Sequence, residues 1–361
     1  MENKFKSRSE QRKTGPSVGR IKYSSPSNIA LVKYWGKRPV QLPANPSISF
    51  TLEHCKTVTE LQFERSSNFA FSVKVNGTSN SAFDSKIERF FNLIQDYMPF
   101  IASYKFQIET SNTFPHSSGI ASSASGMSAL ALCLCRLEQQ LDPEITDAEQ
   151  LQKASFIARI GSGSACRSVY GGVVAWGQAD SITNSSDHYG VQVTPVHSVF
   201  EDFQDTILLV DKGKKAISSS KGHELMNNHP YASARFDQAN ANIYNLMDVI
   251  KTGDLARFIH IVESEALSLH AMMMTSSPGF MLFKPNTVEI IQRVRNIRES
   301  TGLNLCVTLD AGANVHLLYP KNEKEKVMGL IKSELVGFCE NGQYICDEVG
   351  RGPKVLNEDY A

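Results

Sequence analysis

The sequence predicts an α+β protein built from two domains. Its 361 residues are long for one domain and sufficient for two. Strand and helix patterns intermix along the chain, without the regular strand–helix alternation of a doubly wound parallel sheet. The simplest division gives an N-terminal domain at 21–195 and a C-terminal domain at 196–361. Residues 1–20 are rich in Lys and Arg, and we expect them to form a basic, flexible tail.

The N-terminal half begins with strands and continues with helices. Alternating β-branched residues predict strands at 47–63 and 68–76, the second ended by the turn dipeptide Asn76-Gly77. Apolar residues three and four positions apart then predict helices at 84–97, 124–141 and 147–160. A strand at 169–176 and a polar loop at 180–190 complete this half.

The C-terminal half shows the same mixture in another order. A buried strand is predicted at 205–211, followed by long helical patterns at 231–251, 254–273 and 285–301. Two strands at 303–309 and 314–319, a helix near 322–335 and a strand near 343–348 follow. We expect each half to form its own sheet covered by helices.

Composition excludes several classes of function. Lys+Arg and Asp+Glu are equal at 37 each, so no overall basic field favours nucleic acid as a partner. No apolar run reaches the roughly 18 residues of a membrane span, and the basic N-terminus lacks the apolar core of a secretory signal. The seven cysteines form no C-x-x-C pair, which is typical of reduced thiols in a cytoplasmic protein. The nine histidines show no metal-ligand spacing, so no resident metal is expected.

The stretch 115–126, Pro-His-Ser-Ser-Gly-Ile-Ala-Ser-Ser-Ala-Ser-Gly, leads directly into the helix predicted at 124–141. A loop of small residues at a helix N-terminus presents free backbone N–H groups and the positive end of the helix dipole, and both favour phosphate. Gly119 would allow close approach, and the Ser122, Ser123 and Ser125 hydroxyls could contact phosphate or a metal ion. The loop lacks the Walker A lysine and the Rossmann glycine spacing. A Ser/Gly-rich helix cap without a ligand is the alternative.

Three other segments carry residues suited to chemistry. The segment 27–38 is apolar and aromatic but carries three cations, Lys33, Lys37 and Arg38. Cations in this setting could neutralise a phosphorylated substrate. A surface strand with extended lysine side chains would give the same pattern. Arg167 lies in a second Gly/Ser turn at 161–172 and could bind a carboxylate or phosphate, or simply mark a helix-ending turn. Asp310 follows an apolar strand before small residues, which suits a general base in a cleft or an Asx turn.

Together these segments resemble the mevalonate diphosphate decarboxylase family, within the GHMP kinase superfamily. The matching stretches are Asn28-Ile-Ala-Leu-Val-Lys-Tyr-Trp-Gly-Lys37, Phe114 to Gly126, Gly161-Ser-Gly-Ser-Ala-Cys-Arg-Ser168 and Asp310-Ala-Gly-Ala-Asn314. They occur in the family's order over about residues 21–320. The resemblance implies a ribosomal protein S5 domain 2-like N-terminal domain, a ferredoxin-like α+β C-terminal domain, and a site in the cleft between them.

The resemblance also implies an activity and a role for each matching residue. The family decarboxylates mevalonate 5-diphosphate to isopentenyl diphosphate with ATP. Asp310 would act on the 3-hydroxyl of the substrate. Lys33 would orient Asp310, and we expect these two side chains to form an ion pair. Arg167 would hold the substrate carboxylate. Substrate-binding positions would be Tyr34, Lys37, Ser162, Gly163, Ser164 and Ser219. ATP-binding positions would be Pro115, Ser118, Gly119, Ala121, Ser122, Ser123 and Ser125. ATP would bring Mg²⁺, held near Ser123, and a homodimer is expected.

Some positions depart from the family pattern. Asn45-Pro-Ser stands where the family usually has Asn-Ser-Ser, and His116-Ser-Ser replaces a run similar to Thr-Ala-Ala. Around 218–223, Ser-Ser-Ser-Lys-Gly-His, the family often has Ser-x-x-Gly-Met, so the roles of Ser219, Ser220 and Lys221 stay open.

Two other functions compete with decarboxylation. A kinase of the same superfamily would phosphorylate mevalonate or a phosphomevalonate without releasing CO₂. A superfamily member without catalysis would act as a binding module for a sugar or an isoprenoid. The combined presence of Asp310, Lys33 and Arg167 favours the decarboxylase over both.

Overall fold

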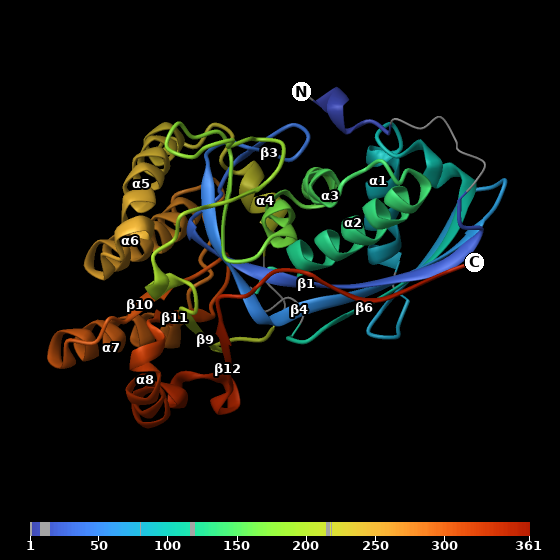
Figure 1. Ribbon diagram of the computed structural model, residues 1–361. Coiled ribbons are helices and arrows are strands. Elements are labelled where there is room, and N and C mark those ends of the chain that lie inside the picture. Colours follow the sequence, from blue (N-terminus) through green and yellow to red (C-terminus); the bar gives the residue numbers. More distant parts are fainter. Residues whose placement is uncertain (1, 8–14, 80, 116–119, 214–216, 218) are drawn as a thin grey trace.

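Two β-sheets form the framework of the molecule, and each carries helices on a face (Figure 1). The computed structural model describes residues 2–7, 15–79, 81–115, 120–213, 217 and 219–361. A seven-stranded sheet belongs mainly to the N-terminal half and a four-stranded sheet to the C-terminal half. Among the described residues, no helix has both the length and the apolar character needed to cross a membrane.

The large sheet has its central strands in the order β13-β1-β4-β6-β5, and β7 and β8 extend it from β4. All its pairings are antiparallel except that between β5 and β6. The strands are β1 (Val18–Val32), β4 (Ser47–Arg65), β5 (Ala70–Val75), β6 (Tyr104–Asn112), β7 (Val173–Trp176), β8 (Val191–Gln192) and β13 (Lys354–Tyr360). A small hairpin, β2 (Lys37–Arg38) with β3 (Leu42–Pro43), projects between β1 and β4.

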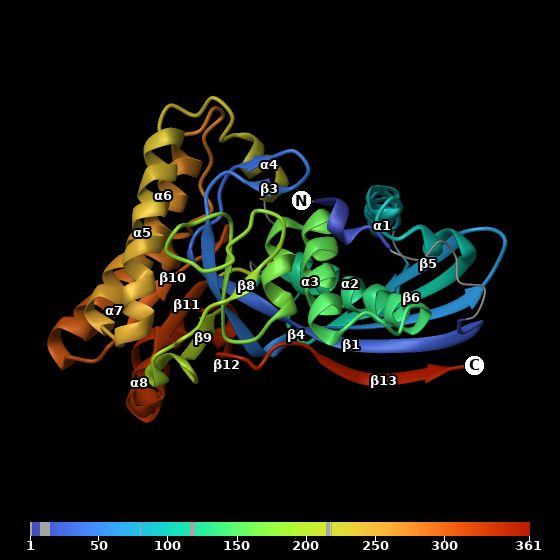
Figure 2. The same ribbon diagram turned by 45° about the horizontal axis from the view of Figure 1, so that its top comes forward.

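Three helices cover one face of the large sheet: α1 (Ser81–Ile94), α2 (Ser122–Leu141) and α3 (Asp147–Gly161) (Figure 2). The central helix α2 is buried on most sides, since its apolar residues meet the sheet on one side and α3 on the other. Thr146 begins α3 with a capping box to Glu149, which satisfies two free N–H groups of the first turn. A 3₁₀ turn, Gly163–Val169, follows α3 directly and carries Arg167.

The C-terminal sheet has the order β10-β11-β9-β12 and is antiparallel throughout. Its strands are β9 (Gln204–Leu208), β10 (Cys306–Thr308), β11 (Val315–Tyr319) and β12 (Tyr344–Glu348). The helices of this half are α4 (Ser219–Glu224), α5 (Ala232–Thr252), α6 (Leu255–Met274), α7 (Pro285–Thr301) and α8 (Lys324–Leu330). Helical turns continue after α8 to Gly342.

A continuous apolar core connects the two halves. Ile29 and Leu31 of β1 and Phe50 of β4 pack in one cluster with Phe200 and with Phe258 of α6. Because this contact is apolar and buried, it fixes the C-terminal half against the end of the large sheet. The residues that follow β1 and β10 are thereby held close together.

The two-domain α+β architecture is confirmed, but the ends of the chain differ from expectation. The strand β13 lies in the large sheet beside β1, so the last residues join the N-terminal sheet rather than the C-terminal half. The described part of the expected tail also packs: Phe5 is buried at 4% exposure, in a 3₁₀ turn at Glu2–Phe5, and β1 already begins at Val18. Apolar burial of Phe5 overrides the solvation of the surrounding cations.

Candidate active site

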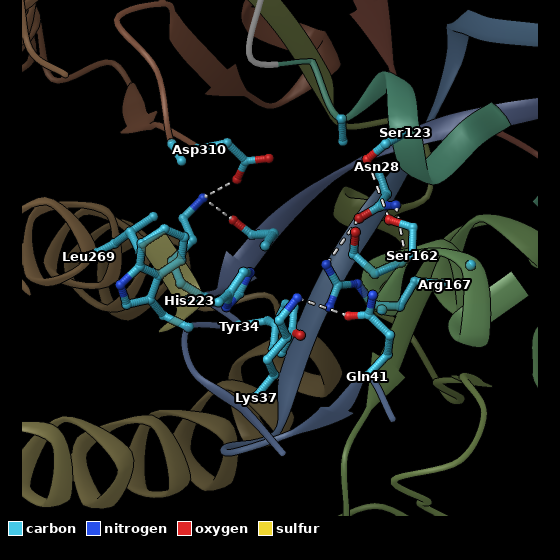
Figure 3. A pocket seen from close by; sticks show the side chains of 18 of the residues that line it. Asn28, Tyr34, Lys37, Gln41, Ser123, Ser162, Arg167, His223, Leu269 and Asp310 are labelled. Atoms are coloured by element: carbon cyan, nitrogen blue, oxygen red, sulfur yellow. Dashed lines mark hydrogen bonds and ion pairs between the residues drawn. The ribbon is translucent and has the colours of Figure 1, made fainter. Parts of the chain in front are cut away.

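A pocket lies where the N-terminal helices, the end of β1 and the C-terminal half meet (Figure 3). It collects side chains from segments more than 270 residues apart in the sequence, because β1 and β10 end beside each other. The residues that line it are Asn28, Ala30, Lys33, Tyr34, Trp35, Lys37, Gln41, Lys86, Ala121, Ser123, Gly161, Ser162, Gly163, Ser164, Arg167, His223, Leu269, Asp310 and Ala311.

Lys33 and Asp310 form an ion pair at one end of the pocket. The Lys33 ammonium lies 3.1 Å from Asp310 Oδ1 and donates a second hydrogen bond to the Ala30 carbonyl at 2.6 Å. The lysine side chain is 1% exposed and the aspartate side chain 25%. Burial lowers the pKa of Lys33, and the neighbouring Asp310 carboxylate opposes that shift. The pair predicted from the resemblance is therefore present, with its carboxylate on the open side.

Buried residues of the C-terminal helices hold Lys33 in place. Its backbone N–H donates to Glu265 Oε2 on α6 at 2.8 Å. The Glu265 carboxylate is fully buried, forms an ion pair with Arg235 of α5 and accepts a hydrogen bond from Asn242 at 2.6 Å. This network fixes the backbone from which the lysine extends. Sequence reasoning missed it, because nothing in the chain links α5 and α6 to residue 33 before the fold is known.

Arg167 is a buried cation facing the same pocket. Its side chain is 2% exposed, and its guanidinium donates to Asn28 Oδ1 at 3.1 Å and to the Ser47 hydroxyl. Its Nε has no hydrogen-bond partner among the described residues, and no described carboxylate lies within ion-pair distance of it. Burial lowers the pKa of Arg167, as expected for a cation held by neutral oxygens. A guanidinium in this state is suited to bind an anion that enters the pocket.

An aromatic wall lies beside Arg167. The ring of Tyr34 packs against Trp176 at 4.7 Å between centroids and against the His223 ring at 4.2 Å. Its hydroxyl is buried and has no partner among the described residues. Gly163 approaches this wall so closely that a Cβ there would lie 2.8 Å from the Trp176 ring and 3.0 Å from the Tyr34 hydroxyl. Position 163 therefore requires glycine.

Two further lysines line the pocket. Lys37 comes from the β2–β3 hairpin and donates to Gln41 at 3.2 Å, while Lys86 comes from α1. Both add positive charge to the pocket, which is suited to a phosphate group. Lys37 was predicted, whereas Gln41 and Lys86 were missed because they stand outside the matching motifs. A lysine on a surface helix gives no local signal of its function.

The N-terminus of α2 reaches the pocket through Ala121 and Ser123. Ala121 has a positive φ of 41°, and the Ser123 hydroxyl lies 3.4 Å from that of Ser162. Ser125, in contrast, is fully buried and hydrogen-bonds to Thr57 of β4 at 2.6 Å, so its predicted contact with phosphate is wrong. Neither Pro115 nor Ser122 lines the pocket. Ser118 and Gly119 lie outside the described residues, and for Ser219 only the backbone, in α4, is described.

Comparison with known proteins identifies the family. Residues 25–188 match the diphosphomevalonate decarboxylase-like N-terminal domain, and 206–356 match the mevalonate 5-diphosphate decarboxylase C-terminal domain. The chain belongs to the mevalonate diphosphate decarboxylase family. The two matched ranges leave the N-terminal segment outside the family domains, as the sequence resemblance also does.

Members of the decarboxylase family are similar along most of the chain. The diphosphomevalonate decarboxylase of Ganoderma lucidum is 32% identical over 87% of this chain and 82% of its own, and that of Gibberella zeae is 30% identical over 89% and 86%. The Staphylococcus aureus crystal structure superposes with a TM-score of 0.81 at 28% identity, covering 94% of this chain and 98% of that one. A structure of MDDEF in complex with MVAPP, AMPPCP and magnesium gives a TM-score of 0.80 at 27% identity, covering 94% and 99%.

Proposed function

We propose that this chain catalyses the ATP-dependent decarboxylation of mevalonate 5-diphosphate to isopentenyl diphosphate, with release of ADP, phosphate and CO₂. The observation that carries the proposal is the convergence of the Lys33–Asp310 pair and the buried Arg167 on one pocket. Family membership and the names of the relatives support the same reaction.

Asp310 is placed to begin the reaction. Lys33 holds its Oδ1 and so orients the carboxylate, which would accept the proton of the substrate's 3-hydroxyl as that oxygen attacks the γ-phosphorus of ATP. The bond between the γ-phosphorus and the ADP oxygen breaks, and the 3-hydroxyl becomes a phosphate ester. The bond between C3 and the ester oxygen then breaks, and phosphate leaves with the bonding electrons. The electrons of the bond to the carboxylate then form the new double bond, and CO₂ departs.

Arg167 would hold the carboxylate that becomes CO₂. Its two guanidinium donors to Asn28 and Ser47 fix the plane of the group, and its Nε has no hydrogen-bond partner in the part of the chain that the structure describes. Positive charge develops at C3 when phosphate leaves, so cations near C3 should be neutralised. Pairing Lys33 with Asp310 meets this condition.

The remaining residues would bind the two sets of phosphates. Tyr34, Lys37, Ser162, Gly163 and Ser164 line the pocket and would contact the substrate diphosphate, with Ser219 as a further contact. MgATP enters as a substrate. The N-terminus of α2 with Ala121 and the Ser123 hydroxyl fits its phosphates, because free N–H groups and the helix dipole favour anions. Pro115, Ser118, Gly119 and Ser122 would complete that loop. Mg²⁺ would be held by the nucleotide and by Ser123, and its charge would assist departure of ADP.

Replacement of the general base tests this assignment. Asp310→Asn keeps the size of the side chain and removes its ability to take a proton. We expect ADP and CO₂ production from ATP and mevalonate 5-diphosphate to fall together by at least about 100-fold. Asp248→Asn, on the exposed surface of α5, is the matched control and should retain activity. An Asp310→Asn protein with activity close to wild type would refute the proposed role.

Assembly and location complete the proposal. We propose a homodimer, as the superfamily suggests, and light scattering of the purified protein would test it. We also propose a cytoplasmic location in the isoprenoid pathway, which the seven free cysteines support, since thiols stay reduced there.

A further inference from the structure

We propose that His223 is a substrate-binding residue, a neutral hydrogen-bond donor to the anionic group held beside Lys37. This inference rests on the proposed function, in which that anion is the substrate diphosphate. It concerns a position to which the family resemblance assigns no role.

The short helix α4 places His223 in the pocket. The imidazole is 8% exposed and packs between the rings of Tyr34, at 4.2 Å, and Trp35, at 4.5 Å between centroids. In Figure 3 it lies close to Tyr34 and on the same side of the pocket as Lys37. The ring therefore has a fixed orientation, and it belongs to the lining of the substrate site.

One ring nitrogen of His223 is already used. Nδ1 lies 3.0 Å from the backbone nitrogen of Gly36 and accepts a hydrogen bond from its N–H. An accepting Nδ1 carries a lone pair, so the neutral ring bears its proton on Nε2. The fold thus selects the tautomer, and Nε2 becomes a donor. This Nε2 makes no hydrogen bond to any described residue, so its proton is available to a ligand.

The surroundings keep the ring uncharged. Burial together with the nearby Lys37 ammonium lowers the pKa of His223 to about 3. Tyr34 is the other titratable group in contact with the ring, and on α4 itself Lys221 and Glu224 pair with each other at 3.3 Å. Protonation would also place a hydrogen on Nδ1 against the Gly36 N–H. His223 is therefore neutral at the pH at which the enzyme works.

A neutral donor next to Lys37 has a clear chemical use. Lys37 supplies charge without strong directional preference, whereas an imidazole N–H held by stacking points in one direction. It can contact a diphosphate oxygen without adding a cation to a site in which positive charge develops at C3. The donor would act on substrate affinity more than on the chemical step.

Three variants separate the two nitrogens. His223→Gln carries an amide N–H near the Nε2 position, His223→Asn carries an acceptor near the Nδ1 position, and His223→Met keeps bulk but has neither group. We expect the KM for mevalonate 5-diphosphate to rise about 10- to 100-fold in the Asn and Met variants, from loss of one hydrogen bond to a charged group. The Gln variant should stay within about threefold of wild type, because one donor is retained.

The kinetic pattern distinguishes binding from packing. The kcat and the KM for ATP should change little, and the matched control His260→Gln, on the exposed surface of α6, should behave as wild type. Equal defects in the Gln, Asn and Met variants would show that only stacking matters and would overturn the proposal. So would an unchanged KM in the Asn variant.

A spectroscopic test does not depend on turnover. In protein labelled with ¹⁵N-histidine, the signals absent from His223→Gln report this ring. They should show the neutral Nε2–H form from pH 5 to 8, and inorganic diphosphate should shift the Nε2 signal. Titration within this range, the Nδ1–H form, or no response to diphosphate would overturn the proposal. If the wild-type protein released no CO₂, the proposed function would fail, and this measurement would still decide the role of His223.

Discussion

Lys33 shows how one residue can serve catalysis at a cost to stability. Its ammonium is taken almost completely out of water, and its carboxylate partner Asp310 remains a quarter exposed. Removing a charge from water is expensive, and a partner at 3.1 Å only partly compensates. Its place in the fold is therefore better explained by the need to orient Asp310 than by stability.

This reasoning predicts opposite effects in Lys33→Met. The variant should lose at least about 100-fold in kcat/KM, because Asp310 is no longer held in position. Its free energy of unfolding should stay within about 1 kcal/mol of wild type or increase, since a buried charge is replaced by an apolar chain of similar length. Steady-state assays and urea denaturation measure the two effects, with the exposed Lys74→Met as control. Near-normal activity in Lys33→Met would contradict the assignment.

The serines near the start of α2 show what residue patterns could and could not predict. The loop was correctly placed before a helix, and Ser123 reaches the pocket. Ser125 fails for a reason that helix geometry supplies: two residues along a helix turn the side chain by about 200°, so Ser125 faces β4 instead. The sequence predicted that the helix starts at 124, whereas α2 begins at Ser122. With the start misplaced by two residues, the direction of each serine side chain could not be predicted.

At the scale of elements, β4 is the strand that joins both ends of the fold. It pairs with β1, β6 and β7, and its residue Glu53 receives three donors, one from β4 itself and two from the C-terminal segment. Arg351 N–H donates to Glu53 at 2.9 Å, and the ammonium groups of Lys56 and Lys354 lie at 2.9 and 3.2 Å. Burial opposes ionisation of Glu53, but these donors outweigh it and lower its pKa to about 2.

The lowered pKa of Glu53 predicts a stability difference that depends on pH. A carboxylate with a lowered pKa in the folded state stabilises the protein above its unfolded pKa, and this contribution is lost as pH falls from about 4.5 to about 2. With allowance for solvent screening, Glu53→Gln should lower the free energy of unfolding by about 1 kcal/mol at pH 7. In urea denaturation, the difference in free energy of unfolding between Glu53→Gln and wild type should approach zero near pH 2.5. A gap that is constant with pH would show that Glu53 acts through packing; Glu289→Gln, in an exposed pair, is the control.

The strands that sequence patterns missed share a physical cause. In β1, Pro26 interrupts the run, and the register with β4 shifts between Pro26 and Asn28. In β13, most side chains are exposed, so no buried face marks it as a strand. Its order comes from backbone pairing with β1, whose sequence is more than 300 residues away. Local patterns predict elements that bury a face, and β13 does not.

At the scale of the whole molecule, the N-terminal segment closes the helical layer. Phe5 stacks on Phe156 of α3 at 4.2 Å between ring centroids, and Glu2 lies 3.5 Å from the buried Arg159 guanidinium. Arg159 in turn donates to the carbonyls of Val40 and His188. Val40 belongs to the hairpin that carries Lys37. The N-terminal segment therefore helps to fix the position of this hairpin, through Arg159.

Truncation of Phe5 tests that connection. Phe5→Ala should lower the free energy of unfolding by about 3 kcal/mol, the usual cost of emptying an aromatic site in a core. A change below about 1 kcal/mol would show that the segment does not pack as described. Tyr244→Ala, at 72% exposure, is the control and should leave stability within about 0.5 kcal/mol of wild type. Calorimetric unfolding of the full chain measures both.

The pocket itself depends on the whole fold. The motifs around Lys33, Arg167 and Asp310 were predicted to act together, and the structure brings them to one place. His223, Gln41 and Lys86 were not predicted as site residues, since each enters from an element whose position is set by packing elsewhere. The chemistry of the site follows from motifs, and its remaining lining follows from tertiary structure.

The most direct test of the central claim is the stoichiometry of products from the purified wild-type protein. With ATP, Mg²⁺ and limiting mevalonate 5-diphosphate, we predict one CO₂, one ADP and one phosphate for each isopentenyl diphosphate formed. ADP without CO₂ would identify a kinase that stops after phosphoryl transfer. The absence of both products would contradict the proposed enzyme and favour a binding module.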